Sequence, residues 1–197
     1  MIYPKFIEAN GKRYPINTDF RVAIECNRVA EDDSITDIER ALGVICLLFG
    51  DEALEDTENY EKLSELAQKY LRCGKEEIDN STEKPDMDYI EDMDYIETSF
   101  MSDYHIDLTK TEMHWWKFSN LMNGLSDSEL GDCCILNRIR NLRNFDTKDI
   151  EDTKQKTKIE KAKQQVALKK YKTKKHITEE QKQSARELYE ALGFGKE

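Results

Sequence analysis

Residues that interrupt helices are scarce in this chain: only 8 glycines and 3 prolines occur among its 197 residues. That is about half the usual share of these two residue types, and it leaves few positions for the tight turns of sandwiches and barrels. Leu, Ile, Val and Phe make up 43 residues, just above the roughly 20 % below which a charged chain tends to stay disordered. The sequence therefore predicts a mainly α-helical fold, a multi-helix bundle with a thin core.

The N-terminus carries the clearest strand pattern. Asn10-Gly11 separates two β-prone runs, 6–9 and 12–16, and both central positions of such a turn need positive φ angles. A small N-terminal β-hairpin is therefore predicted. Pro15 is expected at a sheet edge or a strand end, because proline cannot donate a hydrogen bond to a ladder.

Apolar periodicity and capping patterns predict helices through the rest of the chain. Thr36-x-x-Glu39 is a capping box, and Thr109-x-x-Glu112 and Ser126-x-x-Glu129 repeat the pattern. Each should therefore mark a helix start. The predicted helices cover approximately residues 17–30, 36–49, 57–73, 88–104, 109–122, 126–142, 147–173 and 178–192.

Composition divides the chain into four parts. Residues 1–74 should hold the hairpin and the first helices, and residues 75–87, without an apolar period, should form an acidic linker. Residues 88–145 form a helical region that contains the motif His114-Trp115-Trp116-Lys117-Phe118, and residues 146–197 form a long Lys-rich helical arm with a C-terminal helix.

Charge is strongly segregated along the sequence. Residues 76–107 contain 12 acidic side chains and one lysine, whereas residues 154–176 contain ten lysines and one glutamate. The basic stretch could be a solvated helix, a nucleic-acid-binding helix, or a helix that pairs with an acidic surface. That acidic surface could lie in the chain's own acidic segment or in a partner.

No pattern of catalytic or metal-binding residues appears. A calcium loop needs a central glycine, and none occurs between Gly74 and Gly124; the three histidines lack metal-ligand spacing, and there is no glycine-rich phosphate loop. The five cysteines contain no C-x-x-C pair and are expected to be free, buried thiols. The sequence thus predicts a non-enzymatic protein with no cofactor and no bound metal.

No membrane partner is expected either. The longest apolar run, 44–49, is far too short to span a bilayer, and the first 30 residues contain no signal-peptide core. A cytoplasmic location is the resulting expectation.

The paired tryptophans are the sharpest aromatic feature. Consecutive residues on a helix point about 100° apart, so Trp115 and Trp116 can both be buried only if the helix is covered on two sides. At least one ring is expected in the core, and the other is a candidate for a partner surface.

Two blocks carry a resemblance to a known family. They are Asp94-Tyr95-Ile96, with Phe100 and the stretch from Asp103 to Leu108, and the motif at 114–118 followed by Leu121. With the 6–16 segment, Thr18-Asp19-Phe20-Arg21 and the Lys-rich C-terminal helix, the chain resembles the phage gene-product-fifteen family of long-tailed phages and prophages of Gram-positive bacteria. The sequence departs from the family pattern at two places. Residues 86–97 contain a duplicated Asp-Met-Asp-Tyr-Ile-Glu, and His105 stands where a small turn residue would be unsurprising.

The resemblance implies a non-enzymatic tail assembly chaperone that binds the tape-measure protein and aids tail tube assembly. It would act in the host cell cytoplasm and be absent from the mature virion. The implied partners are the tape-measure protein, a smaller companion tail assembly chaperone and the tail tube protein, with a second copy of the chain as a further candidate. The alternatives are a phage-encoded regulator that binds nucleic acid or a host protein through the basic helix, and a minor virion structural protein; nucleic acid is the less favoured partner. The candidate partner-binding residues are Trp115, Trp116, Phe118, Lys161, Lys163, Lys169 and Lys170.

Overall fold

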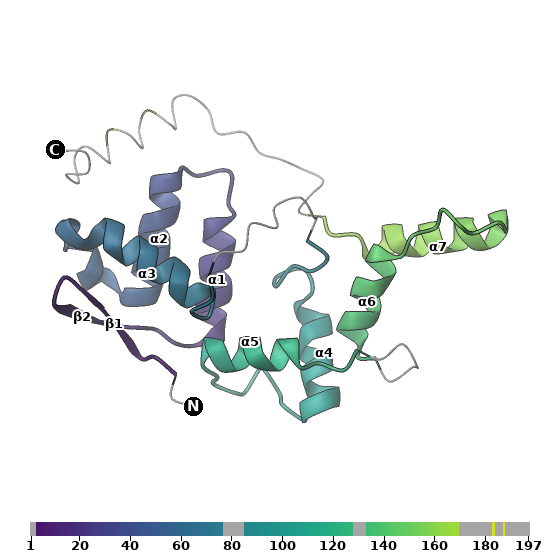
Figure 1. Cartoon of the computed structure of the whole chain (residues 1–197), viewed down its shortest axis with the longest axis horizontal. Coiled ribbons are helices and arrows are strands. Elements are labelled where there is room, and N and C mark those ends of the chain that lie inside the picture. Colours follow the sequence, from purple (N-terminus) through teal and green to yellow (C-terminus); the bar gives the residue numbers. More distant parts are fainter. Residues whose placement is uncertain (1–2, 77–84, 128–132, 170–182, 184–186, 188–197) are drawn as a thin grey trace. The chain divides into compact units, whose positions relative to one another are not determined.

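The computed structural model describes residues 3–76, 85–127 and 133–169, together with Gln183 and Glu187. Within these residues the mainly α fold, the N-terminal hairpin and the Lys-rich helix are confirmed (Figure 1). The predicted helix at 178–192 lies outside the described residues, apart from Gln183 and Glu187. The elements are β1 (Phe6–Ala9), β2 (Lys12–Pro15), α1 (Phe20–Ala30), α2 (Asp37–Phe49), α3 (Tyr60–Leu71), α4 (Met93–Tyr104), α5 (Trp115–Asn123), α6 (Ile135–Asn144) and α7 (Thr153–Val166), with short 3₁₀ helices at Asp51–Leu54 and Thr57–Asn59.

The described residues group into two compact units. The first contains residues 3–76 and 112–120, with Gln183 and Glu187; the second contains residues 85–111, 121–127 and 133–169. The start of α5 thus belongs with the N-terminal elements, although the sequence-based division places it within 88–145.

The hairpin is fixed to the first unit by polar contacts. Asn10 and Gly11 have φ angles of 49° and 81°, as the turn requires, and Pro15 pairs with Phe6 at the strand end. The Tyr14 hydroxyl donates to Asp56 Oδ2 (2.6 Å), which also accepts from Lys12 Nζ (2.6 Å). These donors lower the pKa of Asp56 to about 2.

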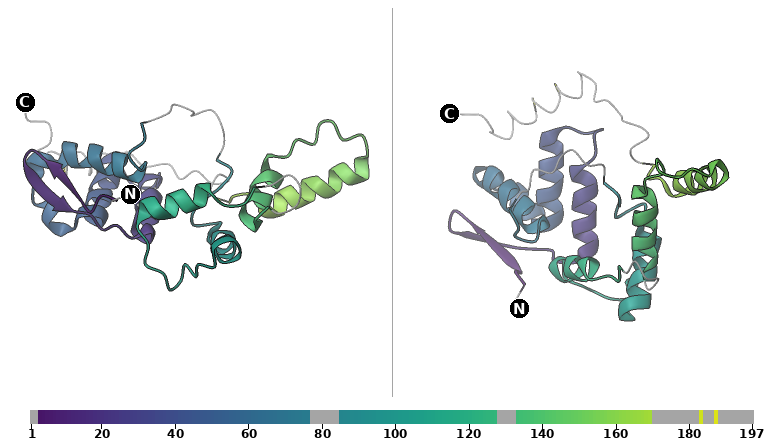
Figure 2. Two further views of the ribbon diagram at one scale, coloured as in Figure 1. Left: turned by 60° about the horizontal axis from the view of Figure 1, so that its bottom comes forward. Right: turned by 45° about the vertical axis from the view of Figure 1, so that its right-hand side comes forward.

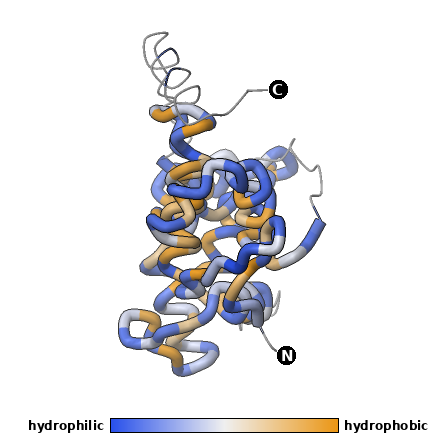
Figure 3. The backbone as a smooth tube through the Cα atoms, turned by 90° about the vertical axis from the view of Figure 1, so that its left-hand side faces the viewer, coloured by the Kyte–Doolittle hydropathy of each residue, from blue (hydrophilic) through white to orange (hydrophobic). Residues whose placement is uncertain are grey.

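Helices α1, α2 and α3 pack together, and α3 contacts strand β1 of the hairpin (Figures 1 and 2). The capping box at the start of α2 is confirmed, with the Glu39 N–H bound to the Thr36 hydroxyl and the Thr36 N–H bound to the Glu39 carboxylate. Hydrophobic residues recur among hydrophilic ones along the helices (Figure 3). The buried side chains of this unit include Phe20, Ala23, Ile24, Ile45, Leu48, Leu63 and Ala67.

The second unit is built on α4 and α6, which pack against each other. The Ser99 hydroxyl, fully buried on α4, accepts the Leu136 N–H at the start of α6 (3.1 Å). This contact satisfies a backbone donor that a helix N-terminus leaves without an intrahelical partner. Helix α7 then packs on α6 and buries none of its own residues.

Four predicted helix starts are wrong or only partly covered. Helix α7, predicted over 147–173, begins at Thr153, because Asp152 caps its first turn, and ends at Val166. Helix α4 begins at Met93, not near 88, because Asp88 Oδ1 accepts the N–H groups of Ile90 (2.8 Å) and Glu91 (2.9 Å) in a turn. Helix α5 begins at Trp115, because Asp107 binds the N–H and the hydroxyl of Thr109, which therefore caps no helix. Helix α6 begins at Ile135, while residues 128–132 of the predicted helix lie outside the described residues.

Helix α4 ends at a residue held in the left-handed conformation. His105 has a φ of 56° and is exposed, and its N–H donates to Met101 O (3.2 Å). A side chain with a Cβ is disfavoured at this φ, and glycine is the usual residue there.

Replacing His105 by glycine should therefore stabilise the protein by about 0.5–1 kcal/mol, because relief of backbone strain outweighs the larger entropy of the unfolded chain. The measurement is urea unfolding followed by circular dichroism. His105→Ala is the matched control, since it removes the imidazole but keeps the Cβ. Equal stability of the two variants would contradict the backbone explanation.

Candidate partner-binding surfaces

The 114–118 motif is joined to the N-terminal elements through its backbone. Phe20 N–H donates to Met113 O (2.9 Å), and Trp115 N–H donates to Thr18 O (2.8 Å). His114 Nδ1 accepts the Trp116 N–H (3.0 Å), so Nε2 carries the proton that Pro4 O accepts (2.9 Å). The imidazole thus acts as the N-terminal cap of α5.

Both tryptophans bind the C-terminal end of α3. Trp115 Nε1 donates to Leu71 O and Trp116 Nε1 donates to Tyr70 O, each at 2.9 Å. The last carbonyls of a helix have no intrahelical donors, and two adjacent indoles supply them here. The Trp116 ring also covers Gly74, where an added Cβ would lie 3.2 Å from its Cη2 atom.

Two of the three predicted aromatic site residues lie in the core. Phe118 is fully buried and stacks on Phe20, with ring centroids 4.6 Å apart, and Trp115 is 3 % exposed. Trp116 is half-buried beside Tyr70 and Tyr3. Trp115 and Phe118 therefore have a structural role in this conformation, and Trp116 is the aromatic residue of the motif that a partner could touch.

The two tryptophans should differ in what they contribute to stability. Trp115→Ala empties a core site and should cost about 3–5 kcal/mol, whereas Trp116→Ala removes a half-buried ring and should cost about 1–3 kcal/mol. Urea unfolding measures both values. Equal losses would contradict the difference in burial, and an unchanged stability of Trp115→Ala would contradict its core position.

A single arginine connects four segments of the second unit. Arg143 forms a two-bond ion pair with Asp92, with both N–O distances 2.7 Å, and the two side chains are only 10 % and 1 % exposed. Its guanidinium also donates to Asp86 O (2.8 Å) and to Val166 O (2.7 Å). The last contact binds the C-terminal end of α7, so Arg143 holds that helix against α6.

The internal repeat supplies both acidic partners of α6. The two copies, 86–91 and 92–97, differ in conformation: the first forms turns and the second enters α4. Yet the first aspartate of each copy binds an arginine of α6, Asp86 to Arg140 (3.1 Å) and Asp92 to Arg143. The repeat thus provides α6 with a second aspartate for an ion pair, and it does not repeat a helix face.

Replacing Arg143 by methionine should cost about 3–5 kcal/mol, because it leaves the Asp92 carboxylate buried without its counter-charge. Urea unfolding again gives the value, and the exposed Arg138→Met on the same helix is the control. Adding Asp92→Leu to Arg143→Met should recover much of the loss. A double variant no more stable than Arg143→Met would show that the buried charge is not the cause.

Helix α7 presents a row of exposed lysines. Asp152 caps its first turn by accepting the Lys154 N–H (2.8 Å). Lys154, Lys158 and Lys161 are exposed and follow the i, i+4, i+7 spacing of one helix face. In the part of the chain that the structure describes, no carboxylate forms an ion pair with these three residues, which we call the lysine stripe.

The other predicted lysines lie in different environments. Lys163 Nζ donates to Phe145 O, and Lys169 is exposed and donates its backbone N–H to Glu91 Oε2 (2.7 Å). Lys170 lies outside the described residues. Of the predicted lysines, Lys161 is thus the one that belongs to the stripe.

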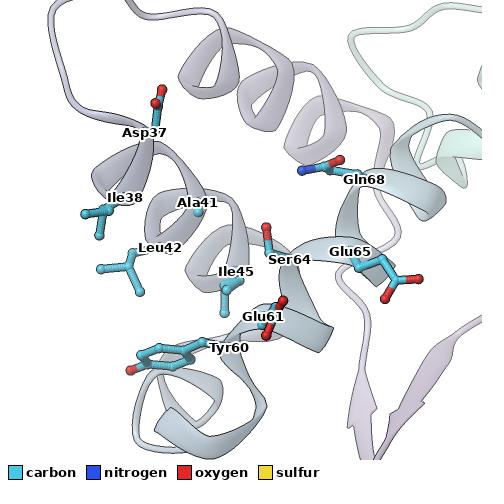
Figure 4. A pocket seen from close by; sticks show the side chains of 10 residues that line it. All are labelled: Asp37, Ile38, Ala41, Leu42, Ile45, Tyr60, Glu61, Ser64, Glu65 and Gln68. Carbon is cyan, nitrogen blue, oxygen red and sulfur yellow. The ribbon is translucent and has the colours of Figure 1, made fainter. Parts of the chain in front are cut away.

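A groove runs between α2 and α3 in the first unit. It has a volume of about 550 Å³, and Figure 4 shows Ile38, Leu42 and Ile45 along α2, with Tyr60 of α3 near Ile45. An adjoining hollow of about 370 Å³ shares four of its lining residues. The groove is lined by Asp37, Ile38, Ala41, Leu42, Ile45, Tyr60, Glu61, Ser64, Glu65 and Gln68.

The described residues contain neither a membrane-spanning helix nor a cluster of metal ligands. No described helix combines the length and the apolar character that crossing a membrane requires. Among the same residues, no group of three or more His, Cys, Asp or Glu side chains is arranged to hold a metal ion. All five cysteines are free, with Cys26 and Cys134 buried and the other three half-buried.

These observations define a small, predominantly α-helical protein whose candidate sites are surfaces: an acid-lined groove and a stripe of lysines. The chain belongs to the family described as Bacteriophage Gp15 protein, whose model matches residues 3–168. The match includes the tryptophan motif and α7, and it confirms the family indicated by the sequence. No curated protein and no solved structure matches the chain.

Proposed function

We propose that this phage protein is a non-enzymatic tail assembly chaperone that binds the tape-measure protein and aids assembly of the tail tube. Membership in the Gp15 family over residues 3–168 supports a phage role, and the lysine stripe on α7 is the observation that carries the binding role. The stripe consists of charges without acidic partners in the described structure, on a helix that buries no residue of its own.

The chemistry of the stripe fits an elongated helical client. Lys154 and Lys161 lie seven residues apart, two turns of helix or roughly 10 Å, so the stripe matches acidic side chains spaced along another helix. Exposed ion pairs are individually weak and are screened over about 10 Å at 0.1 M salt. Binding of this kind forms fast and reverses readily, which suits a chaperone that must leave the finished tail.

The remaining parts of the proposal follow from the same role. The companion partners are a smaller tail assembly chaperone and the tail tube protein, in phages or prophages of Gram-positive bacteria, and a second copy of the chain is a further candidate. The protein would work in the host cell cytoplasm and be absent from the mature virion. Mass spectrometry of purified virions tests this last point, because a minor structural protein would be retained.

The lysine stripe also favours a second candidate, a regulator that binds nucleic acid. Phosphate backbones attract such a helix, and binding would weaken steeply with salt. The formal net charge of −11 opposes this reading. DNA binding with a strong salt dependence, together with no capture of the tape-measure protein, would favour the regulator.

Reversing the stripe should weaken capture of the tape-measure protein. In Lys154→Glu, Lys158→Glu and Lys161→Glu combined, we expect at least about tenfold less co-purified tape-measure protein, because three attractions become repulsions. The fold should be kept, since none of the three side chains is buried. The matched control reverses three exposed lysines of the first unit, Lys5, Lys69 and Lys75.

Co-expression followed by affinity purification at several salt concentrations gives the measurement. Circular dichroism confirms that both triple variants are folded. If the stripe variant captures as much tape-measure protein as the control at every salt concentration, the stripe is a solvated face and the proposed binding role fails.

A further inference from the structure

Beyond its first turn, helix α2 is apolar on every side. Its last nine residues, 41–49, contain no charged, amide or hydroxyl side chain. A helix of this composition is normally covered all round. Helices α1 and α3 pack against α2, yet Ile38, Ala41 and Leu42 stay only half-buried where they line the groove between α2 and α3. The groove is therefore an apolar face of α2 that the described elements leave partly open.

The floor of this groove has the spacing of a helix-binding site. Ile38, Leu42 and Ile45 follow one another at i, i+4 and i+7, with Tyr60 of α3 near Ile45 (Figure 4). This row is two helical turns long, and recognition of a helix in a groove uses apolar anchors at the same spacing. The adjoining hollow continues the groove as far as Ala30 at the end of α1. One face of a short amphipathic helix therefore fits the floor.

Every charged residue that lines this groove is acidic. Asp37 pairs with Arg40 and Glu65 pairs with Lys62, but the two carboxylate side chains are 92 % and 65 % exposed. Ion pairs this exposed contribute little, so both carboxylates can accept another cation. Glu61 is exposed and has no ion pair among the described residues. The rim therefore attracts lysine or arginine and repels phosphate groups and acidic peptides.

We infer that the α2–α3 groove is a docking site for a basic amphipathic helix of another protein. Apolar side chains of that helix at i, i+4 and i+7 cover Ile38 and Leu42, and its lysines or arginines meet Glu61 and Glu65. The inference goes beyond the proposed chaperone role. The groove belongs to the first unit and takes a basic partner, whereas the lysine stripe belongs to the second unit and takes an acidic one.

The test is fluorescence anisotropy of a labelled, designed peptide with the full-length protein. The peptide has about 15 residues, with leucines at i, i+4 and i+7 and lysines on both flanks of that stripe. We expect saturable binding that weakens as salt is added. A peptide of the same composition, with its leucines spread round the helix, should bind at least about tenfold more weakly, because it has no apolar stripe.

Charge reversal on the rim shows where the peptide binds. Glu61→Lys with Glu65→Lys should weaken binding at least about tenfold, because attraction becomes repulsion. The same variant should bind a peptide with glutamates in place of the lysines more tightly than the unmodified protein does. Both residues are exposed, so the fold should be kept. The matched control, Glu8→Lys with Glu52→Lys, reverses two exposed acids away from the groove and should leave the affinity within about twofold.

Leu42→Ala tests the floor separately from the rim. It should weaken binding of the lysine peptide roughly three- to tenfold, because a half-buried apolar contact is lost. Circular dichroism confirms that each variant is folded. Equal binding of the striped and unstriped peptides would overturn the inference, as would a rim reversal that behaves like its control.

Light scattering separates a different protein from a second copy of the chain. We expect reversal of the rim to leave the molecular mass of the free protein unchanged. If the chain instead forms a dimer that Glu61→Lys with Glu65→Lys dissociates, a second copy occupies the groove and the inference as stated is wrong.

Discussion

The Arg143 guanidinium is the contact on which the candidate client-binding surface depends. It satisfies the buried Asp92 carboxylate with two bonds and uses two further donors on Asp86 O and Val166 O. Because α7 buries no side chain, it cannot be held by apolar packing alone. Its position on α6 instead depends on a few polar contacts, of which the Arg143 bond to its last turn is the best buried. The lysine stripe can therefore stay exposed without losing its place in the unit.

The tryptophan motif shows that a conspicuous sequence pattern can have a structural role. Both indole N–H groups bind carbonyls at the end of α3, and Phe118 fills the core against Phe20. These contacts join residues more than forty positions apart in sequence. The block that identifies the family is thus the block that joins α5 to α3. Within it, recognition of a partner can involve Trp116, which keeps some exposed surface.

Local patterns predicted the hairpin, the Thr36 capping box and the order of helices, because neighbouring residues determine each of them. The Thr109 pattern failed because Asp107, two residues earlier, binds the hydroxyl that was expected to cap a helix. The sequence named the tryptophans and the lysines as site residues. It could not show that Trp115 is buried or that Lys163 donates to Phe145 O, since both depend on distant segments. The α2–α3 groove was missed for the same reason: residues of two helices create it.

The difference between arginine and lysine explains why Asp86 and Asp92 of the acidic block pair with α6. Arginine offers a planar fork of donors that fits a carboxylate with two bonds and tolerates burial, whereas lysine is a strongly hydrated point charge. Accordingly, Asp86 and Asp92 of the acidic block bind Arg140 and Arg143 of α6 rather than lysines. Helix α6 thus takes up two carboxylates of the acidic block. Lys154, Lys158 and Lys161 are exposed and have no ion pair among the described residues, so the lysine stripe is available to an acidic partner.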